Sequence, residues 1–151
     1  CAFGAELIED GSSIRVSLAN LHSTEIDASD IPDLVPVISA IAATADGTTK
    51  IYNATRLRLK ESDRIKSIVE MINSLGGDAH EIEDGIIING RKSLSGGTVE
   101  SFNDHRIVMA AAVASQKCEN CVIINKAQAV NKSYPEFFKD FNSLGGDANV
   151  M

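Results

Sequence analysis

An internal repeat restricts the fold of this sequence more than any other feature. The heptapeptide NSLGGDA occupies residues 73–79 and recurs without change at residues 142–148. The same order of elements is expected before each copy: an alanine-rich helix, a short strand, a polar loop with a lysine (Lys60 or Lys132), and an amphipathic helix. Self-similarity of this kind indicates two copies of one structural unit. The repeat therefore predicts an α/β domain in which helices pack beside mixed β-sheets.

Two β-hairpins are expected from apolar and β-branched runs around Asp-Gly pairs. The first covers residues 6–18, and the alternation of its second half, 14–18, is typical of a half-buried strand. The second covers residues 80–88, where Asp84-Gly85 favours the positive φ angles of a type I′ turn. Three further strands are expected at residues 50–53, 98–102 and 122–124.

Four helices are predicted, at residues 34–45, 63–75, 105–115 and 134–144. The third is apolar nearly all round, so we expect it to be buried on most sides. Asp33 is a candidate N-cap of the first helix, with Pro36 in the first turn, where a proline costs no hydrogen bond. The other candidate caps are Ser62, then Asn103 or Asp104, then a capping box formed by Ser133 and Glu136.

The starts of these helices also carry basic residues, which is unusual. Arg64 and Arg106 lie in first turns, where the positive end of the helix dipole disfavours each cation by about 0.3–1 kcal/mol. Lys60 and Lys132 come shortly before helix starts as well. Because helix N-termini and guanidinium groups both bind carboxylate and phosphate, these four cations predict a site for an anionic small molecule.

The alternative is that each arginine pairs with a neighbouring carboxylate on a solvated surface, namely Glu61 or Asp63 for the first and Asp104 for the second. His105 could orient a proton or donate to an anion, although this pattern more often belongs to a histidine without a catalytic role. Glu61 could act as a general acid or base if desolvation raised its pKa. Most exposed glutamates have no such function.

Composition excludes several classes of function. With 21 acidic and 14 basic residues the formal charge is −7, which disfavours nucleic acid as a partner. The longest apolar run, residues 107–114, is far shorter than the roughly 20 residues of a membrane-spanning helix. The three cysteines are too few for a disulfide framework, and no secretory leader is visible, so we expect a cytoplasmic protein. Because residue 1 is Cys rather than Met and strand-like sequence follows within a few residues, we interpret the chain as a fragment.

Cys118 and Cys121 form a C-x-x-C pair, but it follows a helix, whereas redox-active pairs usually lie at a helix start. A structural zinc site needs four ligands, and the sequence has no second such pair. The Gly-Gly pairs match neither a Walker motif nor a dinucleotide-binding motif. The sequence thus predicts neither a metal nor an ATP or NAD cofactor.

Four segments together resemble the C-terminal part of the EPSP synthase family, the 3-phosphoshikimate 1-carboxyvinyltransferases. These segments are IPDLV (31–35), LKESDRI (59–65), NDHRI (103–107) and NKSYPEF (131–137). They occur in the family's order and with plausible spacing, and the resemblance extends over nearly the whole chain. The combination of KESDR with NDHR some 40 residues later is specific, whereas either motif alone would be weaker.

The resemblance implies an enzyme of two similar domains, each with three βαβαββ units, and an active site in the cleft between them. Residues 1–151 would be most of the C-terminal domain, with about two units and half of the site. The implied reaction transfers the enolpyruvyl group of phosphoenolpyruvate to the 5-hydroxyl of shikimate 3-phosphate and releases phosphate, in aromatic amino-acid biosynthesis. It requires no metal or organic cofactor, and the missing N-terminal portion of the enzyme would complete the site.

The resemblance also implies roles for particular residues. The proton acceptor would be Asp33, the acid/base glutamate Glu61, the shikimate-phosphate contact Lys60, and the phosphoenolpyruvate-binding cations Arg64, Arg106 and Lys132. Asp104 and His105 flank Arg106 in the same motif, which makes Asp104 a candidate for binding and His105 a candidate for catalysis. Arg56 replaces an asparagine that touches the sugar phosphate in some members, so that contact is not carried over.

Two other interpretations remain open. One is a domain that binds anions without catalysis. The other is a sister enolpyruvyl transferase acting on UDP-N-acetylglucosamine, which shares the fold, although the KESDR and NDHR motifs favour EPSP synthase.

Overall fold

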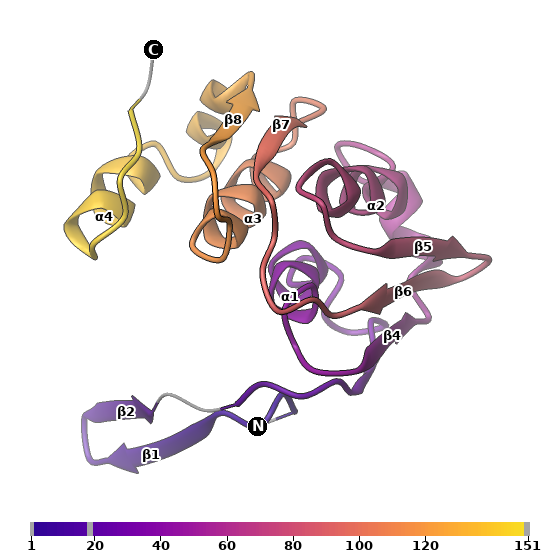
Figure 1. The fold of residues 1–151 in the computed structure, drawn as a ribbon, viewed down its shortest axis with the longest axis horizontal. Helices are drawn as coiled ribbons and strands as arrows, with labels where there is room; N and C mark the ends of the chain where they lie inside the picture. Colours follow the sequence, from indigo (N-terminus) through magenta and orange to yellow (C-terminus); the bar gives the residue numbers. More distant parts are fainter. Residues whose placement is uncertain (1, 18–19, 150–151) are drawn as a thin grey trace.

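The repeated unit is visible in the order of the helices and strands. The protein is described by a computed structural model over residues 2–17 and 20–149, so Cys1 and Leu18, the expected end of the first hairpin, lie outside the described residues. The first unit contains helix α1 (Val35–Ala42), strand β4 (Thr48–Tyr52), the 3₁₀ helix η1 (Thr55–Leu59) and helix α2 (Arg64–Ser74). The second repeats this order with α3 (His105–Ser115), β8 (Val122–Asn125), η2 (Ala127–Lys132) and α4 (Phe137–Ser143), and Figure 1 shows both along the chain. The four predicted helices are confirmed.

The strands of the described residues form three small sheets. In the first, β1 (Glu6–Asp10) pairs antiparallel with β2 (Ser13–Ser17). The second has the order β3 (Glu25–Asp27), β4, β6 (Gly85–Asn89) and β5 (Ala79–Ile82); β3 is parallel to β4, and the other pairs are antiparallel. In the third, β7 (Gly97–Glu100) runs parallel to β8. Strand β3 was not predicted, because its three residues are too few to show a pattern.

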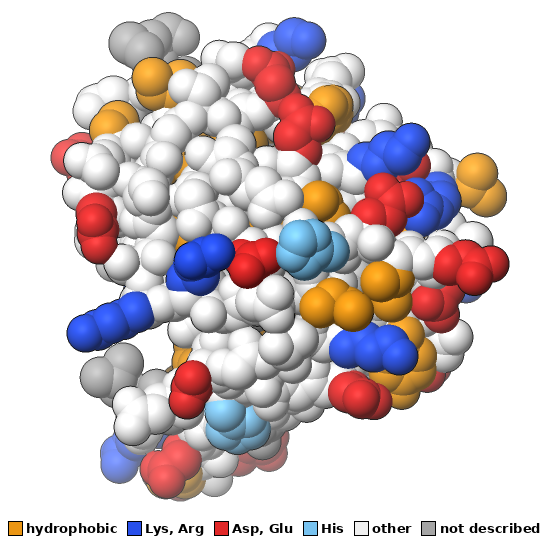
Figure 2. Space-filling model, turned by 45° about the vertical axis from the view of Figure 1, so that its right-hand side comes forward, with side chains coloured by type: hydrophobic (Ala, Val, Ile, Leu, Met, Phe, Trp, Pro, Cys, Tyr) orange, Lys and Arg blue, Asp and Glu red, His pale blue; other side chains and the backbone are white. Residues whose placement is uncertain are grey.

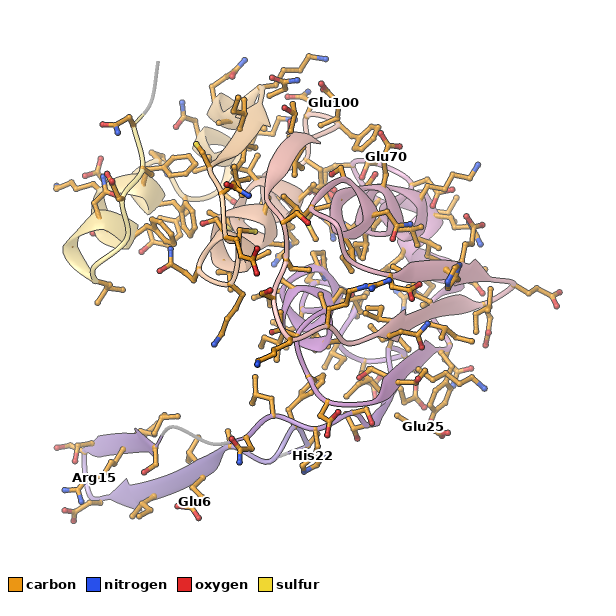
Figure 3. The ribbon with its side chains drawn as sticks, in the orientation of Figure 1. Glu6, Arg15, His22, Glu25, Glu70 and Glu100 are labelled. Carbon is orange, nitrogen blue, oxygen red and sulfur yellow. The ribbon has the colours of Figure 1, made fainter. Side chains whose placement is uncertain are left out.

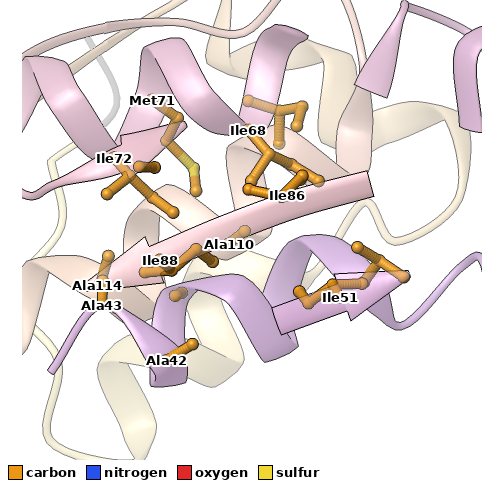
Figure 4. Close-up of a cluster of buried hydrophobic side chains, with 14 of the residues drawn as sticks. Ala42, Ala43, Ile51, Ile68, Met71, Ile72, Ile86, Ile88, Ala110 and Ala114 are labelled. Carbon is orange, nitrogen blue, oxygen red and sulfur yellow. The ribbon is translucent and has the colours of Figure 1, made fainter. Parts of the chain in front are cut away.

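The main core lies between the four-stranded sheet and the helices α1, α2 and α3. Ile68, Met71 and Ile72 of α2 lie over Ile86 and Ile88 of β6, and all five side chains are buried (Figure 4). Alanines of α1 and α3 face the same core, and small side chains let helices approach each other closely. Helix α3 is buried on most of its length, as its composition predicted.

The two heptapeptides have the same local structure. The Asn73 side chain donates to the carbonyl oxygen of Ala79 at 2.9 Å and accepts from its N–H at 2.8 Å. Asn142 makes the same two hydrogen bonds to Ala148, at 2.9 and 2.8 Å. The first glycine of each copy is left-handed, with φ of 82° and 98°, which ends the helix without a Cβ clash. The repeat in sequence is therefore a repeat in structure.

The first hairpin forms as predicted, but its second strand is not half-buried. β1 and β2 project from the body of the molecule, and Glu6 and Arg15 lie far from the helices (Figures 1 and 3). The apolar side chains of Ile14 and Val16 are 65% and 64% exposed. The prediction of a half-buried strand is wrong because, in the described part of the chain, the face that would be buried lies in solvent.

The turn of the second hairpin also differs from the prediction. Ile82 pairs with Gly85, so the two-residue loop is Glu83-Asp84. Asp84 and Gly85 both lie outside the positive-φ region that a type I′ turn requires, so that prediction is wrong. A glycine is needed at position 85 for another reason, because a Cβ there would lie 1.9 Å from the carbonyl oxygen of Ile51.

The surface carries charges of both signs. Figure 2 shows acidic and basic side chains interspersed over one face, beside scattered apolar side chains. Within the part of the chain that the structure describes, no helix has the length and apolar character needed to cross a membrane.

Candidate active site

Two of the predicted helix caps are not formed. The N-cap of α1 is Leu34, so Asp33 lies one residue too early, and its carboxylate binds cationic side chains instead of the helix backbone. The N-cap of α4 is Glu136, which makes no side-chain capping bond, so the capping box with Ser133 is also absent. The Glu136 carboxylate is instead 2.7 Å from the ammonium group of Lys139.

The starts of α2 and α3 are capped by aspartates. Asp63, and not Ser62 as predicted, caps α2 and accepts from the N–H of Lys66 at 3.3 Å. Asp104 caps α3, one of the two predicted possibilities, and accepts from the N–H of Arg106 at 2.9 Å. Ser62 is thereby free to bond elsewhere, and its hydroxyl donates to Asp104 at 3.1 Å. This contact joins the two helix starts.

The Arg64 guanidinium is the centre of the site and is fully buried. Its Nε donates to Oδ2 of Asp104 at 2.8 Å, and its Nη2 contacts Oδ1 of the same carboxylate at 3.3 Å. On the open side, Nη1 donates to Asp33 at 2.8 Å and Nη2 to Glu61 at 2.5 Å. Burial lowers the pKa of Arg64, but the hydrogen bonds and charge of Asp104, with the other carboxylates, raise it above its usual value. The arginine is therefore permanently charged.

The Asp104 carboxylate is buried together with Arg64. Burial by itself raises the pKa of Asp104, but hydrogen bonds from Arg64 and from the Arg106 N–H, the charge of Arg64 and the Ser62 hydroxyl together hold it below its usual value. A buried ion pair of this kind keeps its geometry because displacing either partner leaves an uncompensated charge. Asp104 therefore fixes Arg64 from the protein side.

Asp33 links Arg64 to two further cations. Its carboxylate is 3.5 Å from Nζ of Lys60 and 3.2 Å from Nη2 of Arg106, and its main-chain carbonyl accepts from Nη1 of Arg106 at 3.0 Å. Burial raises the pKa of Asp33, but the Arg64 hydrogen bond and the charges of Arg106, Lys60 and Arg64 lower it below its usual value. The Asp33 side chain is 48% exposed, so a ligand can reach this part of the site.

Lys132 and His105 lie beside this network at the start of α3. The Lys132 ammonium group donates to the carbonyl oxygen of Asn103. Phe102 and Asn103 both have positive φ angles, 52° and 57°, which non-glycine residues seldom adopt. His105 is 7% exposed, and within the described chain no hydrogen-bond partner reaches its Nδ1.

The structure brings six of the predicted site residues into one network of ion pairs: Asp33, Lys60, Glu61, Arg64, Asp104 and Arg106. Lys132 adjoins it through Asn103, and His105 lies between Asp104 and Arg106 in the sequence. The alternative of solvated surface pairs is wrong for Arg64, which pairs with Glu61 and Asp104 but is buried. Arg106 pairs with Asp33 rather than with the Asp104 side chain, although its N–H bonds to that residue.

Sequence reasoning missed the connection of Ser62 and Ser67 to this network. The Ser67 hydroxyl lies 3.1 Å from that of Ser62, and Ser67 is 3% exposed. The available signal was Ser67, a polar residue on the apolar face of a predicted helix.

Cys118 and Cys121 lie outside this network as free thiols, and burial raises the pKa of Cys118. Among the described residues, no group of three or more His, Cys, Asp or Glu is placed to hold a metal ion.

A model of the EPSP synthase (3-phosphoshikimate 1-carboxyvinyltransferase) family matches residues 2–141. The 3-phosphoshikimate 1-carboxyvinyltransferase of Clostridium acetobutylicum is 50% identical over 140 residues, which are 93% of this chain and 33% of that protein. The enzyme of the same name from Methanocorpusculum labreanum is 43% identical over 145 residues, 96% of this chain and 34% of that protein. The chain thus spans about one third of the length of the curated relatives that it matches.

Solved structures agree with these matches. Two structures of EPSP synthase from Acinetobacter baumannii superpose with TM-scores of 0.83 and 0.84, at 28% and 26% sequence identity. They cover 93% and 99% of this chain, and the chain covers 36% and 38% of theirs. The predicted fold class, helices packed beside mixed sheets as in enolpyruvyl transferases, is confirmed.

Proposed function

The chain belongs to the EPSP synthase family, and on that premise we propose that it provides half of the active site of a 3-phosphoshikimate 1-carboxyvinyltransferase. That enzyme transfers the enolpyruvyl group of phosphoenolpyruvate to the 5-hydroxyl of shikimate 3-phosphate and releases phosphate. The observation that carries the proposal is the meeting of Lys60, Arg64 and Arg106 at one carboxylate, Asp33. Cations concentrated at helix starts, in a chain of charge −7, are suited to small anionic substrates.

We further propose that residues 1–151 form most of the C-terminal domain, with two repeat units, and that further protein covers the exposed hairpin. One face of β1 and β2 carries the cross-strand pairs Leu7–Val16 and Glu9–Ile14, and its apolar members are exposed. The hairpin of β5 and β6 has pairs of similar character at the same distance from its turn, Ala79–Ile88 and Glu81–Ile86, and α2 packs against it. Among the described residues no helix packs against the matching face of β1 and β2, which supports a missing portion of the same enzyme as the partner of this face.

The cations bind the substrate anions. Arg64 and Arg106 hold the carboxylate and phosphate of phosphoenolpyruvate with Lys132, and Lys60 holds the phosphate of shikimate 3-phosphate. Asp104 remains bonded to the buried edge of the Arg64 guanidinium, while Asp33 and Glu61 contact its exposed edge in the free chain. A substrate carboxylate therefore takes over N–H groups that these two half-exposed carboxylates contact in the free chain.

The displaced carboxylates then move protons. Asp33, whose pKa lies below its usual value, is ionised at neutral pH, and it accepts the proton of the 5-hydroxyl as that oxygen bonds to C2 of phosphoenolpyruvate. When the substrate takes over the guanidinium N–H groups, Asp33 loses hydrogen bonds that favour its ionised form. Asp33 is therefore a stronger base when the substrate is bound. Glu61 delivers a proton to the methylene carbon C3, and takes a proton back from C3 when the bond from C2 to the phosphate oxygen breaks.

His105 and the guanidinium groups stabilise the charge that develops. The buried Nδ1 of His105 has no partner among the described residues, and we assign it to a polar contact with bound phosphoenolpyruvate. Arg106 and Lys132 stabilise the departing phosphate, because a fixed cation in a water-poor site lowers the free energy of a developing anion.

Shikimate 3-phosphate is favoured over UDP-N-acetylglucosamine as the acceptor because the two relatives compared above are both named for it.

A chimeric enzyme tests this function. This chain would replace the matching third of the Clostridium acetobutylicum relative, with the unaltered relative as the control. We expect phosphate release that requires both phosphoenolpyruvate and shikimate 3-phosphate. A folded chimera without this activity would contradict the proposed function.

The isolated chain provides the second arm of this test. It should release no phosphate from the two substrates, because half of the charge stabilisation and the exclusion of water depend on the other domain. Turnover by the isolated chain would contradict the half-site, since it would require a complete site within residues 1–151.

A further inference from the structure

The hydroxyl group of Ser62 bonds to the buried carboxylate of Asp104, and not to the half-exposed carboxylates of Asp33 and Glu61. It donates to Oδ2 of Asp104 at 3.1 Å, the same oxygen that accepts from Nε of Arg64. The Ser67 hydroxyl, in the first turn of α2, lies 3.1 Å from Ser62 Oγ and 3.0 Å from the carbonyl oxygen of Asp63. The hydroxyls of Ser67 and Ser62 thus form a chain that leads to Asp104.

Neighbouring donors fill the hydrogen-bond acceptor positions of the Asp104 carboxylate. Its two oxygens offer about four acceptor positions. Three of the donors that fill them belong to arginines: Nε and Nη2 of Arg64 and the main-chain N–H of Arg106. The Ser62 hydroxyl is the fourth donor. Without it, the buried carboxylate has an unfilled acceptor position and loses one of the four hydrogen bonds that fix its orientation.

The orientation of Asp104 decides where Arg64 points. A carboxylate that contacts both Nε and Nη2 holds the planar guanidinium in one orientation. The remaining N–H groups of Arg64 then face Asp33 and Glu61, whose side chains are 48% and 41% exposed. A small rotation of Asp104 would turn these N–H groups away from the entry side of the site.

From this geometry we infer that Ser62 is a positioning residue for the anion-binding guanidinium of Arg64, acting through Asp104. Ser67 supports it, because its single hydroxyl proton is shared between Ser62 Oγ and the carbonyl oxygen of Asp63, while Ser62 gives its own proton to Asp104. Hydrogen bonds in such a chain strengthen one another. The inference rests on the proposed function, since it concerns how the phosphoenolpyruvate-binding arginine is held.

The test uses steady-state kinetics of the chimeric enzyme described above. Ser62→Ala should raise the KM for phosphoenolpyruvate roughly 3- to 30-fold, less than the roughly 10- to 150-fold of a lost hydrogen bond to a charged group, because Ser62 acts on Arg64 only through Asp104. The KM for shikimate 3-phosphate should change less than about twofold, because Lys60 is outside the hydroxyl chain. Ser62→Thr keeps the hydroxyl, so its KM for phosphoenolpyruvate should stay close to that of the unsubstituted chimera. Ser67→Ala should give a smaller increase, about two- to fivefold, since it weakens the chain by one bond.

Ser74→Ala is the matched control, because the Ser74 hydroxyl bonds to the Met71 carbonyl at 2.9 Å in the same helix but outside the site. It should leave both KM values unchanged. An unchanged KM for phosphoenolpyruvate in Ser62→Ala, or an equal rise in both KM values, would overturn the inference and leave the proposed function standing. If Ser62→Ala does not fold, Ser67→Ala decides in the same way. A wild-type chimera without turnover would contradict the proposed function itself, and the inference with it.

Discussion

Leu75 and Leu144 hold the same place in two identical heptapeptides, yet Leu75 is fully buried and Leu144 is 88% exposed. The bonds around them are the same, since both helices end at a left-handed glycine and both asparagines bond to the alanine six residues on. The difference comes from packing. Leu75 belongs to the main core under the four-stranded sheet, whereas the end of α4 lies at the edge of the described chain (Figure 1).

This contrast predicts opposite results for the same substitution. Leu75→Ala should lower the free energy of unfolding of the chain by about 2–5 kcal/mol, because it removes buried methyl groups and leaves a cavity. Leu144→Ala should change it by less than about 0.5 kcal/mol, since its side chain is already in water. Urea denaturation of the two purified variants measures both values. Equal losses would contradict the difference in burial.

Amide hydrogen exchange should follow the same division. We expect the strongest protection in α2 and α3, whose apolar faces are buried, and weak protection in the hairpin of β1 and β2, whose side chains are exposed. Exchange measured by mass spectrometry on the isolated chain would show the order. Protection of the hairpin equal to that of α3 would mean that its apolar face is covered in solution.

The pKa of Asp104 predicts how stability depends on pH. Burial raises this pKa, but the contacts with Arg64 and the Arg106 N–H hold it below its usual value in the folded chain. A carboxylate with a lowered folded pKa stabilises the protein above its unfolded pKa, about 3.9, and this contribution is lost as the pH falls through the folded value. The free energy of unfolding should therefore decrease on acidification below about pH 4.

Two variants separate Asp104 from the other carboxylates in this test. Asp104→Asn should cost about 3–5 kcal/mol at pH 7, because it leaves the buried Arg64 without its main partner, and it should flatten the decrease below pH 4. Asp33→Asn, at a half-exposed position, should cost much less. Denaturation curves between pH 3 and pH 7 measure both effects. An unchanged acid profile in Asp104→Asn would contradict the account of this ion pair.

Local sequence patterns predicted the helices and strands other than β3, but not what packs against them. The helices and the heptapeptide turns were predictable because each depends on residues within a few positions. The exposed hairpin was not, because the alternation of Ile14 and Val16 shows that a face is apolar and does not show what covers it. Gly85 is a similar case, since its need for glycine comes from the carbonyl oxygen of Ile51, 34 residues earlier in the chain.

The candidate site was predictable as a set of residues and less so as a set of contacts. Basic residues against the helix dipole indicated Arg64 and Arg106 from the sequence, and the structure places both against Asp33. Ser62 was assigned to the helix cap because serine and aspartate are both good caps. The choice between Ser62 and its neighbour depends on Asp104, 42 residues away, which no local pattern contains.

The role of the cation cluster is tested most directly by Arg106→Ala in the chimeric enzyme, through the KM for phosphoenolpyruvate and the denaturation midpoint. If Arg106 binds the substrate anion, this KM should rise roughly 10- to 150-fold, the effect of losing a charge-assisted contact. The midpoint should barely change, because the substitution removes a cation from the positive end of α3. Arg58→Ala is the control, since Arg58 pairs with Asp63 and Glu81 outside the cluster and should affect stability alone. An unchanged KM with a lowered midpoint in Arg106→Ala would contradict the anion site.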